Sequence, residues 1–173
     1  MNNYLIKDVL GIDSKNFVNN ENYELIKNKD FFNYPFSSNI NIIQKLIKNG
    51  ADDYNHGLSN ACNYGYMNIV KLMIEMRRDD WNNGLWSACF GGHIDIVNIM
   101  IDKGANNWNS GLFYACNYGY MNIVKLMIEK GANNWDNGLY TACHNGHIEI
   151  AKLMIEKGDY DCRECDNTKH TYN

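Results

Sequence analysis

Apolar and polar residues follow one another along this chain in a pattern that recurs every 27 residues. The motif Gly-Leu-x-x-Ala-Cys occurs four times at this spacing, beginning at Gly57, Gly84, Gly111 and Gly138. A second apolar block follows each copy, reading MNIVKLMI at 67–74 and at 121–128, IDIVNIMI at 94–101, and IEIAKLMI at 148–155. Self-similarity at a fixed period indicates a repeat architecture.

Each unit predicts two short helices. The first runs from about Gly57 to Tyr64 and keeps its Leu, Ala and Cys on one side, which is a helical spacing. The residues before the first helix in the later units are good N-caps, namely Asn83, Ser110 and Asn137. The second helix packs an Ile, Val and Met stripe and ends where glycine can turn left-handed, near Gly104, Gly131 and Gly158. Helices shorter than about 12–15 residues are marginal alone, so neighbouring units must stabilise them.

The period divides the chain into segments. We expect four repeats, at 57–83, 84–110, 111–137 and 138–161. Residues 30–56 are a weaker copy, because Ile42 and Ile43 align with Ile69 and Val70, and end repeats of such stacks are commonly atypical. Residues 1–29 do not match the unit. They are expected to form an N-terminal helical cap, or alternatively a separate interaction segment, and residues 162–173 form a C-terminal tail.

The unit resembles the ankyrin repeat from residue 30 to about residue 161. The matching positions read Leu112-x-x-Ala115-x-x-x-Gly119-x-x-x-Ile123-Val124-x-Leu126-Met127-Ile128-x-x-Gly131-Ala132. This resemblance implies an all-α, ankyrin-like helix-turn-helix solenoid. Ankyrin units usually span about 33 residues, and the residues missing here fall before Gly138, where ankyrins have a β-hairpin finger. We therefore predict shortened or absent fingers. The asparagine-rich, isoleucine-rich and lysine-rich composition also resembles that of ankyrin repeat proteins of large DNA viruses.

Composition and charge exclude several classes of function. The net charge of −4 and the interleaved Lys and Glu give no basic face for nucleic acid. No segment is apolar over the roughly 20 residues that a membrane span needs. The N-terminus does not read as a signal peptide, and Asn-x-Ser/Thr is absent. We expect a cytoplasmic protein, in the host cytoplasm if its source is viral.

The cysteines offer candidate chemistry in two places. The four repeat cysteines, expected to be small core residues, are Cys62, Cys89, Cys116 and Cys143. Equivalent residues of stacked repeats lie about 10 Å apart, too far for a disulfide. In the tail, Cys162 and Cys165 with His170 are candidate zinc ligands. No fourth ligand follows them, and Cys162 is in phase with Trp135, so the alternative is that it continues the repeat frame.

Two series of aromatic residues remain. The first, predicted to lie in the shortened loops, is Trp81, Trp108 and Trp135. It either covers the edge of the core or provides a secondary contact to a partner. The second varies between units and lies on the first helices, at Tyr64, Trp86, Phe90, Phe113, Tyr114, Tyr118 and Tyr140. In ankyrin-like stacks the first helices line the concave face, so this series predicts a protein-binding surface; alternatively, some of its members pack between repeats.

No single-copy catalytic constellation is evident, and we expect neither an enzyme nor a cofactor. The leading prediction is a monomeric, non-catalytic protein–protein interaction module that binds a protein of unknown identity through the concave face. Two alternatives stay open. One is a zinc-binding function of the tail, such as contact with nucleic acid, and the other is a structural or self-assembling repeat protein.

Overall fold

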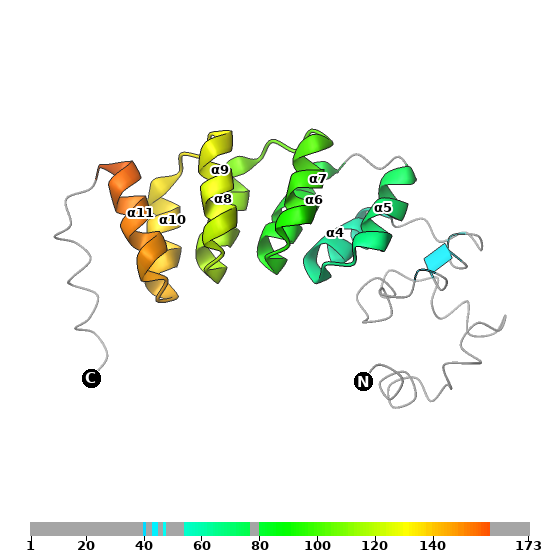
Figure 1. The fold of residues 1–173 in the computed structure, drawn as a ribbon, viewed down its shortest axis with the longest axis horizontal. Coiled ribbons are helices and arrows are strands. Elements are labelled where there is room, and N and C mark those ends of the chain that lie inside the picture. Colours follow the sequence, from blue (N-terminus) through cyan, green and yellow to red (C-terminus); the bar gives the residue numbers. More distant parts are fainter. Residues whose placement is uncertain (1–39, 41–42, 45–46, 48–53, 77–79, 160–173) are drawn as a thin grey trace, which may run out of the picture. The chain divides into compact units, whose positions relative to one another are not determined.

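The structure is a computed structural model that describes residues 40, 43–44, 47, 54–76 and 80–159 (Figure 1). All secondary structure among these residues is helical, without a strand, as the sequence predicts. The chain divides into two compact units, Met1–Asp80 and Trp81–Asn173. The predicted cap at 1–29, most of the weak repeat at 30–56, and the tail at 162–173 lie outside the described residues.

The first unit contains one helical pair, α4 (Tyr54–Tyr64) and α5 (Met67–Glu75). The α4 side chains buried against α5 are Leu58, Ala61 and Cys62, the three that the helical spacing predicts. Ile43 lies in a helix and is fully buried, which fits its alignment with the buried Val70.

The second unit contains three helical pairs. They are α6 (Trp81–Gly91) with α7 (Ile94–Asp102), α8 (Trp108–Tyr118) with α9 (Met121–Lys130), and α10 (Trp135–His144) with α11 (Ile148–Gly158). The three first helices, α6, α8 and α10, start 27 residues apart. Each pair is antiparallel (Figure 1), which confirms the predicted two-helix unit.

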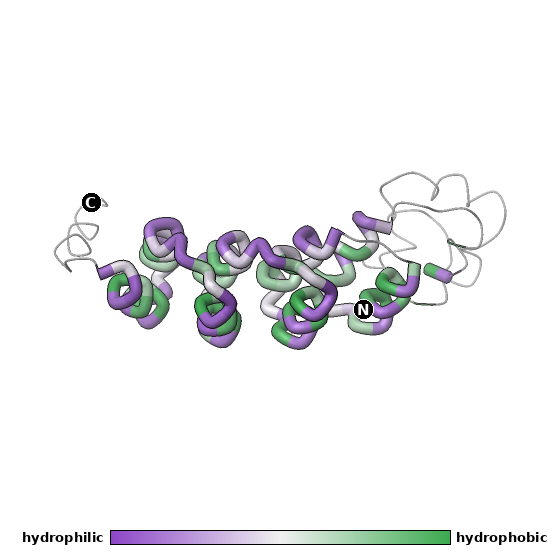
Figure 2. Tube along the Cα trace, turned by 90° about the horizontal axis from the view of Figure 1, so that it is seen from above, coloured by the Kyte–Doolittle hydropathy of each residue, from purple (hydrophilic) through white to green (hydrophobic). Residues whose placement is uncertain are grey.

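The pairs of the second unit stack as two rows. The first helices contact one another more extensively than do the second helices α7 and α9. Figure 2, seen along the helices, shows each helix hydrophobic on part of its circumference and hydrophilic on the rest. The hydrophobic sides meet between the rows, where the fully buried side chains include Leu85, Met100, Leu112, Ile123, Met127 and Met154. Burying a side chain of this size contributes roughly 1.5–3 kcal/mol, which offsets the low intrinsic stability of such short helices.

The glycines of the third and fourth Gly-Leu-x-x-Ala-Cys motifs, Gly111 and Gly138, permit this close packing. A Cβ atom on Gly111 would lie 2.5 Å from Met127 Sδ and 3.3 Å from Cys89 Sγ. Gly138 has the same neighbours one repeat later, Met154 and Cys116. The missing side chain therefore lets a methionine of the same repeat and a cysteine of the preceding repeat meet the helix backbone.

The first helices begin three residues earlier than predicted. Trp108 and Trp135 are the first residues of α8 and α10, and the N-caps are Asn107 and Asn134. The predicted caps were wrong: Ser110 donates its backbone N–H to the side chain of Asn107, at 3.3 Å. Asn137 does the same to Asn134, and Asn83 lies inside α6. The pattern of core residues starts only in the second turn of each helix, which is why it misplaced the start.

The second helices end close to the predicted glycines, with one exception. Gly131 is the left-handed C-cap of α9, and Gly104 is left-handed just after α7. In α11 the helix includes Gly158, and Asp159 takes the left-handed conformation, with φ of 54°. Asparagine and aspartate tolerate this region better than other residues with a side chain.

An asparagine ladder fixes the loops between repeats. Asn82 Oδ1 accepts the backbone N–H groups of Asn106 and Asn107, both at 2.9 Å. One repeat later, Asn109 Oδ1 accepts those of Asn133 and Asn134, at 2.8 and 3.0 Å. Each asparagine belongs to the preceding repeat, so it satisfies two loop donors that a β-hairpin finger would otherwise pair.

In the pairs α6–α7 and α8–α9, the turn between the two helices is covered by a ring from the following repeat. A Cβ atom on the left-handed Gly92 would lie 2.5 Å from the ring of Tyr120. His147 covers Gly119 in the same way, and its Nε2 lies 3.1 Å from the carbonyl oxygen of Asn117. Gly146, in the last described pair, has nothing within 4 Å. Tyrosine and histidine thus serve one structural purpose in this slot.

Replacing Asn109 by alanine tests the ladder. Two loop N–H groups lose their acceptor, so we expect the free energy of unfolding to fall by about 1–2 kcal/mol in urea titrations followed by circular dichroism. Asn109→Asp keeps an acceptor and should retain most of the stability. Asn98→Ala is the control, because Asn98 is an exposed helical asparagine that makes no hydrogen bond within the described part of the chain. Equal losses in Asn109→Ala and Asn98→Ala would contradict the role of the ladder.

Two glycines of equal backbone conformation separate strain from steric conflict. Gly92→Ala and Gly146→Ala place a Cβ at φ of 79° and 75°, which costs about 1–2 kcal/mol in each case. Only Gly92→Ala also displaces a ring, so it should lose at least about 1 kcal/mol more in thermal or urea unfolding. Adding Tyr120→Ala should remove that excess, and an additive double mutant would show that the ring is not involved.

Candidate functional site

The first helices of the second unit present an aromatic surface. We call the first-helix surface the set of side chains Trp86, Phe90, Phe113, Tyr114, Tyr118 and Tyr140. Phe113, Tyr118 and Tyr140 are exposed, to 37%, 41% and 70% of their surface, whereas the other three are half-buried. Large rings at this level of exposure are unusual when they gather on one side of a soluble domain.

Ring contacts join most of this surface across α6 and α8. Trp86 stacks on Tyr114 with centroids 5.3 Å apart, and Phe113 meets the edge of the same tyrosine at 5.2 Å. Phe90 lies 4.6 Å from Tyr118. Contacts of this kind contribute about 0.5–1.5 kcal/mol beyond burial. The expectation that some rings pack between repeats is therefore confirmed for Trp86, Phe90 and Tyr114.

The remaining two aromatic residues of the predicted set stand apart from this network. Tyr140 on α10 stacks only on His144 of the same helix among the described rings, at 6.1 Å. Tyr64 belongs to the first unit, where it is 52% exposed and stacks on Tyr66 at 5.8 Å.

Two equivalent positions on neighbouring first helices hold aromatic residues in one repeat interface and asparagines in the next. Phe90 and Tyr118 occupy them between α6 and α8 as a ring contact. Asn117 and Asn145 occupy the same positions one repeat later, where Asn145 Nδ2 donates to Asn117 Oδ1 at 2.9 Å. This amide pair is not apparent in the sequence, because its partners are 28 residues apart and neither matches the core pattern.

The tryptophan series does not lie in the loops. Trp81, Trp108 and Trp135 are the first residues of α6, α8 and α10, and all three are half-buried. The loop placement was wrong because the asparagine ladder and the Asn107 and Asn134 caps let each helix start at the tryptophan. The side chains flank the loops and remain partly accessible.

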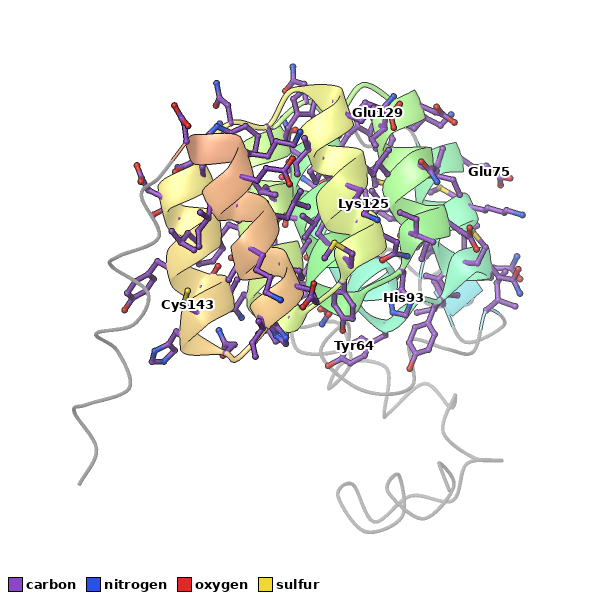
Figure 3. All side chains as sticks on the ribbon, turned by 60° about the vertical axis from the view of Figure 1, so that its left-hand side comes forward. Tyr64, Glu75, His93, Lys125, Glu129 and Cys143 are labelled. Carbon is purple, nitrogen blue, oxygen red and sulfur yellow. The ribbon has the colours of Figure 1, made fainter. Side chains whose placement is uncertain are left out.

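Charge is segregated between the two rows of the second unit. The helices α6, α8 and α10 contain one acidic residue, Asp136, and neither lysine nor arginine. The second helices carry the charges, at Asp95, Asp102, Lys125, Glu129, Lys130, Glu149, Lys152, Glu156 and Lys157. Figure 3 shows Lys125 and Glu129 on α9. An ion pair between Lys152 and Glu149, at 2.9 Å, also lies in this row. The first-helix surface is thus aromatic and nearly uncharged.

Three of the four repeat cysteines are core residues, as expected. Cys62, Cys89 and Cys116 are fully buried free thiols, and burial raises the pKa of each to about 12. A protonated, inaccessible thiol is neither a nucleophile nor a metal ligand. Cys143 on α10 is half-buried (Figure 3). No group of three or more metal-ligating side chains is present within residues the structure describes, and Cys162, Cys165 and His170 lie outside them.

Comparison with known proteins agrees with the helix pairs and their packing. A family model described as ankyrin repeats (3 copies) matches residues 34–111 and again residues 85–169. The chain therefore belongs to the ankyrin repeat family. A search of curated proteins found no significant match. Ankyrin repeats are generally protein–protein interaction modules, and the family is typically non-enzymatic. Among the described residues, no helix is long and apolar enough to cross a membrane.

Thiol chemistry tests the burial of the cysteines. At pH 8, iodoacetamide should modify Cys143 much faster than Cys89 or Cys116, and mass spectrometry of tryptic peptides should show all of them modified in urea. The folded state holds these two thiols protonated, whereas the unfolded chain ionises them near pH 9. Their contribution to stability is therefore complete below pH 9 and declines as the pH rises from about 9 toward 12. Equal labelling rates in the folded protein would contradict this account.

Proposed function

We propose that this chain is a non-catalytic binding module that takes up a protein partner on the first-helix surface. The observation that carries the proposal is the coincidence of exposed rings and missing charge on one row of helices. Aromatic residues dominate the energetic centres of protein interfaces, and charged residues are depleted there. The second helices carry the charges, so that solubility does not depend on the first helices.

The packing of the rows supports a concave binding face. Because the first helices contact one another more extensively than the second helices, their row lies on the inner side of any curvature of the stack. The short loops also leave the first-helix surface accessible to a partner. The connections from α7 to α8 and from α9 to α10 are only five and four residues long, at 103–107 and 131–134, so no finger rises beside the surface.

Substitution of the exposed rings tests this proposal. The double variant Phe113→Ala with Tyr140→Ala should lose at least about 2 kcal/mol of binding to the partner captured from the native cell. Tyr140→Ala alone should change the free energy of unfolding by less than about 1 kcal/mol, because that ring is 70% exposed. Lys125→Ala is the matched control, since Lys125 is exposed on the second helix of the repeat that contains Phe113.

Two results would overturn the proposal. Retention of the partner by the Phe113→Ala, Tyr140→Ala variant at wild-type affinity would place binding elsewhere, with the Trp81, Trp108 and Trp135 flank as the next surface to examine. A change in sedimentation mass without any partner would instead identify self-assembly as the role of this surface.

A further inference from the structure

The first-helix surface combines flat rings with hydrogen-bond donors. Trp86 has an indole N–H, and Tyr114, Tyr118 and Tyr140 have hydroxyl groups. None of these four groups forms a hydrogen bond with any other described residue. A partner that leaves them unmatched on burial would lose about 1–3 kcal/mol for each. The surface therefore favours a partner that brings accessible acceptors together with apolar groups.

The absence of charge restricts the partner further. Asp136 is the only acidic residue on α6, α8 and α10, which carry neither lysine nor arginine, and His144 at the end of α10 is their only histidine. A charged partner side chain would therefore be desolvated with little counter-charge nearby. The contacting part of the partner is therefore uncharged, and its recognition depends little on salt.

The backbone conformation of the partner determines whether its carbonyl groups are free to accept these hydrogen bonds. In an α-helix or a paired strand most backbone carbonyl groups already accept one hydrogen bond and are partly enclosed, so they are poorer acceptors for the indole and phenol donors than free carbonyl groups are. A polyproline II segment has no internal hydrogen bonds, and its carbonyl groups face outward. Proline adds an apolar ring that packs on aromatic faces, and it has no N–H that could be left unpaired.

The spacing of the stack agrees with this form. Helices in contact lie about 8–10 Å apart, and polyproline II advances about 9.3 Å in its three-residue turn. Successive turns of such a peptide can therefore contact successive repeats. One part of the peptide contacts Trp86 and Tyr114, on α6 and α8, and a later turn contacts Tyr140 on α10.

From these four observations we propose that the first-helix surface binds an extended, uncharged, proline-rich peptide segment in the polyproline II conformation. The proposal rests on the binding function argued above and specifies the chemistry of the partner. Trp86 and Tyr114 supply a stacked platform, Phe113 and Tyr140 contact the proline rings, and the indole N–H and tyrosine hydroxyls donate to peptide carbonyl oxygens.

The test is a titration of the full chain with decaproline, acetylated and amidated at its ends. The readout is the Trp86 indole resonance in a proton–nitrogen correlation spectrum, assigned with Trp86→Phe. We expect this resonance to shift on binding, and the Kd to change less than about twofold between roughly 50 and 500 mM NaCl. Phe113→Ala or Tyr140→Ala should weaken binding about tenfold or more. Tyr140→Phe, which removes only a donor, should weaken it about threefold or more, and Lys125→Ala should not change it.

Two further peptides decide between outcomes. A capped Gly-Ser peptide of equal length, which is uncharged but not extended, should not bind. A capped amphipathic helix of Leu, Lys and Glu should bind more weakly than decaproline. If the helix binds through Phe113 and Tyr140 and decaproline does not, the polyproline inference is wrong while the binding function stands. If decaproline does not bind and the native partner is also insensitive to the Phe113→Ala, Tyr140→Ala double variant, both proposals fail.

Discussion

Two helices can be joined to the next pair by four or five residues only when the loop N–H groups find acceptors close by. In the second unit those acceptors come from the preceding repeat, through the side-chain oxygens of Asn82 and Asn109. The loop asparagines Asn107 and Asn134 then cap the helices that follow. Because one repeat satisfies the backbone of the next, the loop and the helix start depend on stacking as much as the apolar core does.

The sequence predicts the repeat, the two helices and the core, because each follows from residues within one unit. Leu112, Ala115 and Cys116 are buried where a helical spacing puts them. The helix starts were not predicted because the core pattern begins only in the second turn, and their caps are local, three residues from the N–H groups that they accept. The ladder was not predicted because each of its side chains bonds to a loop 24 or 25 residues away. Abundant asparagine is visible in the sequence, but an asparagine on a surface and one that bonds to a neighbouring loop look the same without coordinates.

The candidate site was also only partly predictable, because the exposure of each ring depends on the neighbouring repeat. Variation between repeats identified the aromatic positions on α6, α8 and α10, but it gave no measure of exposure. Stacking places Trp86 and Tyr114 against each other and leaves Tyr140 open. The segregation of charge could have been found from the sequence, since the first helices lack lysine in every repeat of the second unit. The low charge of the first helices is what limits the proposed partner to an uncharged contact segment.

The short loops between pairs also constrain how this protein can change its length. Ala105 is buried and donates its backbone N–H to the Met100 carbonyl, while Asn106 and Asn107 are both held by Asn82. An insertion or deletion of one residue would break all three contacts and rotate the next helix out of register. Viable length variants should therefore gain or lose whole units of 27 residues. Each such step would lengthen or shorten the row of first helices by one helix and leave the remaining repeats unaltered.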